Sequence, residues 1–253
     1  MRYFLHLAYN GLNYHGWQRQ PGDITIQEKI ENALSLLFRS YTPLVGAGRT
    51  DAGVNASMMI AHFDTVEPIG DKKRFLASLN GMVDPFNVSF YGIREVIPTA
   101  HARFDAVSRT YRYFIHNRRS PFLYPFSLQV SPETSIEKMN EAARLLLETD
   151  DFTSFAKLHS DNKTNICNVT AAEWKRMSDD HSRYYFEITA NRFLRNMVRS
   201  VTGTLLDVGR GKISLTRFKE IIDEKNRSSA GTSLPPSPLF LYNIEYPENI
   251  FQS

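Results

Sequence analysis

The sequence predicts an α+β fold of two ferredoxin-like units, each with the element order β-α-β-β-α-β. Segments with strand-like alternation are interleaved with segments of helical periodicity, and the same order begins again after about residue 105. The composition, with 42% hydrophobic and 23% charged residues, is ordinary for a globular protein. We therefore expect a first unit over 1–105 and a second over 106–253, each with a mainly antiparallel sheet backed by helices.

The first unit opens with residues 2–10, which alternate and are rich in β-forming residues, as is typical of a strand. Residues 25–40 follow as an amphipathic helix, because Thr25 and Glu28 have capping-box spacing and the apolar residues recur every three or four positions. The remaining elements predicted for this unit are a short strand near 43–47, a strand at 58–65, a helix at 71–83 and a strand at 87–97.

The second unit repeats this order, with an insertion near 150–168 and one extra helix. Asp179 and Asp180 form a polar turn between two alternating segments, which predicts an antiparallel pair. The predicted elements are strands at 109–117, 168–178, 182–191 and 239–246, and helices at 135–148, 192–209 and 215–226. Residues 228–239, rich in Pro and Ser, are expected to form an exposed loop before the final strand.

Composition limits the classes of function. The apolar runs are too short to cross a bilayer, and the N-terminal residues do not have the pattern of a secretory signal, so we expect no membrane association. Cys167 is the only cysteine, which excludes an internal disulfide or a cysteine zinc cluster and fits a reducing cytoplasm.

Arginine is concentrated in two stretches, although the net charge is only +3. Such stretches could hold a polyanion. For either stretch alone, solvated strand and helix faces are the more common explanation. The two groups are Arg109, Arg112, Arg118 and Arg119, followed by Arg192, Arg195 and Arg199.

The loop "GAGRTDAGVNA" at 46–56 places Arg49 and Asp51 two residues apart among glycines. Glycine permits positive φ and close approach of another backbone or a ligand. Taken alone, the loop is better explained as a tight turn in which Asp51 bonds the amides of residues 52 and 53. It lacks the Gly-Lys-Ser/Thr of a phosphate loop and the oxygen spacing of a calcium loop.

Four further blocks change this interpretation. They are "YNGLNYHGWQRQ" at 9–20, "HARFDAVSRTYRY" at 101–113, "DDFTSF" at 150–155 and "NRFLRNMVRSVTGTL" at 191–205. Together with "GRTDAGV", and in this order, they resemble the TruA-type tRNA pseudouridine synthases. The resemblance covers most of the chain and implies the pseudouridine synthase fold, with the two units meeting at a central active-site cleft.

The resemblance implies that Asp51 is the catalytic carboxylate, acting at C1′ of a uridine as nucleophile or as stabiliser of a cationic sugar. It also implies that Arg199 keeps this carboxylate ionised, and that Tyr111 lies against the target base as an acid or base. Without the resemblance, sheet packing would be the simpler explanation of a Tyr in an alternating strand. The isomerisation needs no metal and no cofactor.

Arginines are the expected RNA contacts. Arg49 would occupy the space left by an extruded base, because a uridine in a stem must be flipped out to be attacked. Helical spacing from residue 192 onward would place Arg192, Arg195 and Arg199 on one face, with Phe193, Met197, Val201 and Leu205 on a buried face. The complete set of predicted RNA-binding residues is Arg49, Arg103, Arg109, Arg192 and Arg195.

The implied substrate is the tRNA anticodon stem-loop, at about positions 38 to 40 in tRNA numbering, and the implied assembly is a cytoplasmic homodimer. Two positions depart from the family pattern: Asn55 stands where His is frequent, and Pro238 where Gly is usual. Three alternatives stay open: a non-catalytic RNA-binding module, a hydrolase with Asp51 as nucleophile, and modification of another RNA site.

Overall fold

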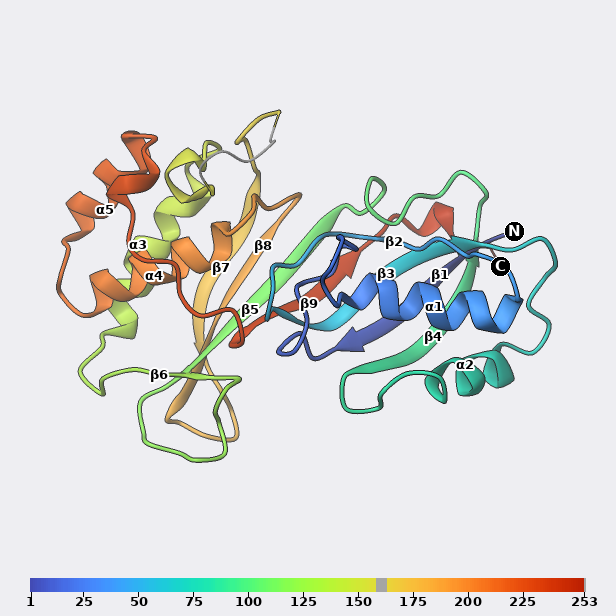
Figure 1. The fold of residues 1–253 in the computed structure, drawn as a ribbon. Helices are drawn as coiled ribbons and strands as arrows, with labels where there is room; N and C mark the ends of the chain where they lie inside the picture. Colours follow the sequence, from blue (N-terminus) through green and yellow to red (C-terminus); the bar gives the residue numbers. More distant parts are fainter. Residues whose placement is uncertain (158–162, 253) are drawn as a thin grey trace. The chain divides into compact units, whose positions relative to one another are not determined.

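A computed structural model describes residues 1–157 and 163–252 (Figure 1). The chain divides by its internal contacts into unit 1, residues 1–108 with 240–253, and unit 2, residues 109–239. The predicted boundary after residue 105 lies near this division. The last strand, which the sequence grouped with the second unit, belongs by its contacts to unit 1. Residues 158–162, within the expected insertion, lie outside the described residues.

In unit 1 the strands β4, β1, β3 and β9 are hydrogen-bonded in that order, and the short strand β2 also pairs with β3. Neighbouring strands are antiparallel except β3 and β9, which pair in parallel through Asn55 with Phe240 and Ala56 with Leu241. The elements are β1 (Arg2–Tyr9), α1 (Ile26–Phe38), β2 (Val45–Gly46), β3 (Asn55–Asp64), α2 (Lys72–Asn80), β4 (Val88–Val96), β9 (Leu239–Glu245) and the 3-10 turn η4 (Glu248–Ile250).

The core of unit 1 lies between one face of this sheet and its two helices. Phe38 of α1, Phe63 of β3 and Phe75 of α2 form a cluster with ring centroids 5.7–6.0 Å apart. Both helices therefore cover the same face of the sheet. Helix α1 starts where predicted, because the Thr25 side chain accepts a hydrogen bond from the Glu28 amide at 3.4 Å.

Unit 2 contains the antiparallel strands β5, β8 and β7, with the short strand β6 parallel to β5. Its three helices pack on one another, and α3 also packs on β7. The elements are β5 (Ser108–His116), β6 (Leu128–Gln129), α3 (Ile136–Arg144), η1 (Leu145–Leu147), η2 (Thr153–Phe155), β7 (Val169–Arg176), β8 (Arg183–Ala190), α4 (Met197–Gly209), α5 (Leu215–Asp223) and η3 (Arg227–Ser229).

Helix α4 begins five residues later than predicted. Asn196 has left-handed backbone geometry, with φ of 67°, and the helix starts only at Met197. The predicted arginine face is therefore wrong, because Arg192 and Arg195 precede the helix while Arg199 lies in its first turn. The apolar face is confirmed from residue 197 onward, since Met197, Val201 and Leu205 are completely buried there, whereas Phe193 lies outside the helix.

Across the described ranges 1–157 and 163–252, none of the helices has both the length and the apolar character needed to cross a membrane.

Candidate active site

The Asp51 loop is held in unit 1 by the segment 11–17, which follows β1. A Cβ on Gly11 would lie 2.0 Å from the Val54 carbonyl oxygen, and one on Gly16 would lie 2.6 Å from that of Thr50. Gly16 also has a φ of +89°. Glycine is required at both positions because the two backbones touch.

Hydrogen bonds join the same two segments. The Trp17 amide donates to the Thr50 carbonyl at 3.2 Å, and the Gly53 amide donates to the Tyr14 carbonyl at 3.2 Å. The side chains of Tyr9 and Thr50 share a buried 2.8 Å hydrogen bond. Thr50, immediately before the aspartate, is thus fixed through both its backbone and its side chain.

Asn55 has a structural role. It is completely buried, and its Oδ1 accepts the Gly11 amide at 2.8 Å. An unprotonated imidazole nitrogen can accept the same kind of bond. The family's frequent histidine and the asparagine of this chain can therefore support the loop in the same way.

Asp51 itself is half-buried, between the buried Thr50 and the turn at Gly53. The turn closes through the main chain, since the Val54 amide donates to the Asp51 carbonyl at 3.1 Å and Gly53 has a φ of 77°. A turn of this kind does not require a carboxyl side chain at residue 51. Arg49, in the same loop, is exposed.

In unit 2, Arg199 is held by the segment 230–238. Its Nε donates to the Leu234 carbonyl at 2.6 Å, and the Leu234 amide donates to the Arg199 carbonyl at 3.2 Å. The segment can cross α4 this closely because a Cβ on Gly203 would lie 2.1 Å from the Thr232 carbonyl oxygen. The guanidinium is therefore oriented by a contact that depends on a glycine one turn further along the helix.

The position of Arg199 is unfavourable for the helix itself. A cation in the first turn is repelled by the positive end of the helix dipole, so a helix of this type favours an anion there. Arg199 is half-buried and lies close enough to Tyr113 to act on it electrostatically. Such an arginine is expected where a negative group is to be bound.

Tyr113 is a buried structural residue. Burial raises the pKa of its hydroxyl strongly, against the opposing effect of the Arg199 charge. The neutral hydroxyl donates to the Pro235 carbonyl at 3.1 Å. The next bond in this loop runs from the Phe114 amide to the Pro238 carbonyl at 3.0 Å. Pro238, which stands where the family usually has glycine, therefore contributes only its main-chain carbonyl, an acceptor that any residue would supply.

Tyr111 lies two residues before Tyr113 on β5, so both side chains project from the same face of the strand. Tyr111 is half-buried, in contrast to the fully buried Tyr113. The ring of Phe193 meets it edge-on, with centroids 5.0 Å apart. Strand alternation thus places Tyr111 on the face of β5 that also approaches Arg199.

The predicted RNA-binding arginines lie in different settings. In unit 2, Arg109 donates to the Asn191 carbonyl at 2.7 Å, and Arg192 donates to the Thr164 carbonyl at 3.4 Å. The Arg195 side chain is exposed, while its carbonyl accepts the Lys157 amide at 3.0 Å. Arg103 is exposed on the segment between β4 and β5 in unit 1.

The first arginine stretch is not one basic patch. Arg112 binds Glu187 through Nε at 2.7 Å, and Lys175 binds the same carboxylate at 2.8 Å. Burial opposes ionisation of Glu187, but the hydrogen bonds from Lys175 and Arg112 outweigh burial and lower its pKa. Arg112 is therefore a structural residue of the β5–β8 pair.

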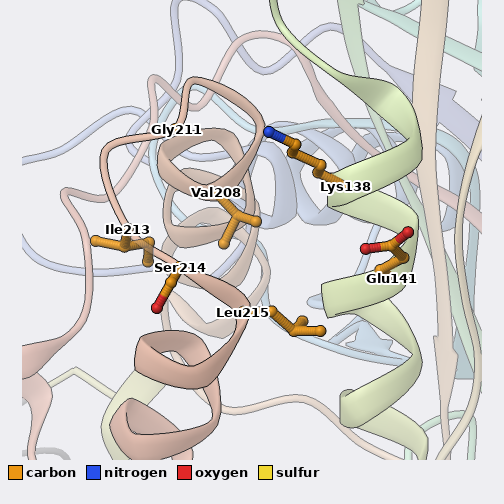
Figure 2. A pocket seen from close by; sticks show the side chains of 7 residues that line it. All are labelled: Lys138, Glu141, Val208, Gly211, Ile213, Ser214 and Leu215. Atoms are coloured by element: carbon orange, nitrogen blue, oxygen red, sulfur yellow. The ribbon is translucent and has the colours of Figure 1, made fainter.

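A pocket of about 320 Å³ lies in unit 2 between α3 and the α4–α5 connection. Figure 2 shows Lys138 and Glu141 on α3 facing Leu215 and the preceding loop. None of the predicted site residues lines this pocket. Its lining consists of Lys138, Glu141, Val208, Gly211, Ile213, Ser214 and Leu215. Among the described residues, no group of three or more His, Cys, Asp or Glu side chains is placed to hold a metal ion.

Comparison with known sequences identifies the class. The profile of the family described as tRNA pseudouridine synthase matches residues 142–247. The tRNA pseudouridine synthase A of Bacteroides thetaiotaomicron is 50% identical over 250 residues, covering 99% of this chain and 92% of the relative. That of Parabacteroides distasonis is 49% identical, covering 99% and 98%. That of Bacillus subtilis is 35% identical, covering 97% and 99%. The chain belongs to the tRNA pseudouridine synthase A family.

The sequence did not predict the segment 11–17 as part of the site. Its signal was present, because Gly11 and Gly16 lie in a short stretch after a strand, where glycines often mark close backbone contact. The partner of that contact could not be read from the sequence.

Proposed function

We propose that this chain isomerises uridine to pseudouridine in the tRNA anticodon stem-loop, with Asp51 as the catalytic carboxylate. The relationship to tRNA pseudouridine synthase A proteins over nearly the whole chain supports the reaction. The observation that carries the assignment of Asp51 is its loop, which is fixed by glycine contacts and buried hydrogen bonds while the aspartate is half-exposed.

The reaction breaks the N1–C1′ bond, turns the detached uracil, and forms a C5–C1′ bond. The C5 hydrogen leaves as a proton and N1 gains one, so no oxidant or reductant is consumed. Asp51 acts at C1′, either as nucleophile or by stabilising positive charge on the sugar. A carboxylate needs to be ionised for either role.

Arg199 and Tyr111 are the proposed partners from unit 2. Arg199 lies in the first turn of α4, and its guanidinium is held by the Leu234 carbonyl. This guanidinium is suited to stabilise the ionised carboxylate of Asp51. Tyr111 is the proposed acid or base at C5 and packs against the target ring. Arg49, Arg103, Arg109, Arg192 and Arg195 are proposed to contact RNA, where phosphate contacts position the substrate.

The finer architecture is also proposed. The antiparallel order β4-β1-β3-β2 supports a ferredoxin-like first unit carrying Asp51. We assign a second such unit to the part of the chain with Tyr111 and Arg199. A cytoplasmic homodimer without metal or cofactor completes the proposal.

Tritium release tests the chemistry. An unmodified tRNA transcript labelled at uracil C5 should lose label with the native protein and keep it with Asp51→Asn. Asp71→Asn is the matched control, because Asp71 caps α2 and Asn caps helices equally well. Equal release by Asp51→Asn would remove Asp51 from the mechanism. Binding without release by the native protein would favour a non-catalytic RNA-binding module.

A further inference from the structure

The segment between β4 and β5 is attached to unit 1 by side-chain hydrogen bonds. Arg2 donates to the Ala100 carbonyl at 2.8 Å while its other nitrogens bind Asp64. The Ala102 amide donates to Nδ1 of the buried His62 at 3.1 Å, and its carbonyl accepts the Tyr246 hydroxyl. The backbone at 100–102 therefore has fixed partners on both sides.

The following residues form a compact turn around His101. Nδ1 of His101 accepts the amides of Arg103 at 3.1 Å and Phe104 at 3.3 Å. The amide of His101 donates to the Asp105 carboxylate at 2.7 Å, and the Asp105 amide returns a bond to the His101 carbonyl at 3.0 Å. The turn thus orders the residues on either side of Phe104.

This rigid turn exposes a large aromatic side chain. Phe104 is 74% exposed, yet its ring lies on that of His101, with centroids 4.3 Å apart and planes 34° apart. The edge of His62 meets His101 with centroids 4.8 Å apart. The Arg103 guanidinium lies over the Phe104 ring, 5.8 Å from its centroid. The His101 ring therefore packs against the Phe104 ring and restricts its orientation, although Phe104 is mostly exposed to solvent.

An aromatic ring that is 74% exposed, contacted by His101 and accompanied by a cation at 5.8 Å fits a nucleobase. Every base has a π-face that can stack on an aromatic ring, and RNA proteins bind unstacked bases in this way. The Arg103 guanidinium, 5.8 Å from the ring centroid, is suited to bind the phosphate that adjoins the stacked base. We propose that Phe104, supported by His101, is a stacking platform for an unpaired base of the RNA substrate.

The platform is separate from the proposed catalytic aspartate. His62, which supports it, lies seven residues beyond Asn55 on β3, or about 23 Å along the strand, while the Asp51 loop precedes Asn55. The base held by Phe104 is therefore a second base, not the uridine that is isomerised. This inference rests on the proposed function only in taking RNA as the substrate.

Binding of unmodified tRNA tests the platform independently of catalysis. Phe104→Ala should bind roughly 5- to 150-fold more weakly, the range for loss of one stacked base, whereas Phe104→Trp should bind at least as well as the native protein. The salt dependence should not change, because no charge is removed. Phe86→Ala is the control, since Phe86 is 87% exposed in the same unit.

Fluorescence of Phe104→Trp gives a direct signal. The native tryptophans, Trp17 and Trp174, are only 2% and 3% exposed, so the added indole is the accessible one. Unmodified tRNA should quench it and protect it from iodide, whereas a blunt RNA duplex without unpaired bases should not. Equal tRNA affinity of Phe104→Ala and the native protein, or an indole unaffected by tRNA, would overturn the platform.

The tritium assay separates this inference from the proposed reaction. If the native protein releases no label but Phe104→Ala binds tRNA more weakly than the native protein, the platform is retained and the proposed reaction is rejected. Normal release together with unchanged tRNA affinity of Phe104→Ala would reject the platform alone. Unfolding curves should coincide for the native protein and Phe104→Ala, because the side chain is mostly exposed.

Discussion

The Asp51 loop of unit 1 and the segment 230–238 that holds Arg199 in unit 2 both depend on a close backbone contact at a glycine. In each, a glycine lets a carbonyl approach to 2.0 Å (Gly11 and Val54) or 2.1 Å (Gly203 and Thr232) of the place where a Cβ would be. They differ in what is positioned. In unit 1 the contact fixes the backbone of the Asp51 loop, whereas in unit 2 it brings in a segment whose carbonyl accepts a hydrogen bond from the Arg199 side chain.

The difference follows from side-chain length. An aspartate has only two side-chain torsions, so a fixed backbone confines its carboxylate to a few nearby positions. An arginine has a long flexible side chain whose ordering costs up to about 2 kcal/mol, and it needs a bond near its end. The following changes test this contrast in order of expected effect.

Arg199→Lys should have the largest effect on activity. Lysine keeps the charge but not the planar group that binds Leu234 through Nε while presenting further donors. We expect a loss of roughly 10²-fold in the single-turnover rate of tritium release, comparable to removal of one oriented donor. Arg192→Lys, outside the helix, should change the rate only a few-fold. A native rate for Arg199→Lys would show that charge alone suffices.

Gly11→Ala should destabilise the protein by about 3 kcal/mol, because the new Cβ collides with the Val54 carbonyl. Activity should fall with it, since the Asp51 loop must move. Urea unfolding measures the first effect and tritium release the second. Gly48→Ala is the matched control in the loop itself, where a Cβ meets no atom within 4 Å. Equal stability of the two variants would contradict the requirement for glycine at residue 11.

Gly203→Ala should destabilise by a smaller amount, about 1–2 kcal/mol, because two effects oppose each other. Alanine favours a helix interior by about 1 kcal/mol over glycine, but the Thr232 carbonyl blocks its Cβ. Urea unfolding decides the sign. A more stable variant would show that segment 230–234 moves aside at little cost, and its rate of tritium release would then report whether Arg199 needs Leu234.

Acidification should distinguish two particular residues, His62 of unit 1 and Glu187 of unit 2. Burial, together with the nearby Arg2 and His101, lowers the pKa of His62 to about 4. The unprotonated Nδ1 accepts the Ala102 amide. The unfolded chain then binds more protons, so stability should fall by about 2 kcal/mol between pH 7 and pH 5 through this residue. Urea unfolding of His62→Asn should show a reduced loss over this range.

Glu187 of unit 2 provides the comparison. Its lowered pKa means that its contribution is present above about pH 4.5 and is lost only as the pH falls further. Glu187→Gln should therefore leave the change between pH 7 and pH 5 unaltered. An equal reduction in His62→Asn and Glu187→Gln would contradict these assignments.

Local patterns predicted most helices and strands because they depend on nearby residues. The helix at Ile26–Phe38 and the strand at Arg2–Tyr9 agree with prediction to within two residues. Helix α4 shows the limit of periodicity. Apolar spacing continues through residues 192–196, but Asn196 tolerates left-handed geometry and delays the helix to Met197. The short strand β2, Val45–Gly46, lies within the strand predicted near 43–47, whereas β6, Leu128–Gln129, was not predicted because two residues give no alternation signal.

The residues of the site were predicted by resemblance, but not what holds them. The glycines at 11 and 16 are visible in the sequence, whereas their contacts with Val54 and Thr50 span more than thirty residues. Leu234 carries no polar side chain, so nothing marked its carbonyl as the partner of Arg199. Backbone groups do not appear in sequence patterns, and in this protein they do most of the positioning.

The pairing of β9 with β3 has a consequence for synthesis. Strand β3 ends at Asp64, yet its parallel partner begins only at Leu239, after all of unit 2 has been made. At a ribosomal rate of roughly 5–20 residues per second, this edge of β3 waits about 10–35 s for its neighbour. Unit 2 can fold during that interval as a continuous stretch of chain. The unit that leaves the ribosome first is thus the last to be completed.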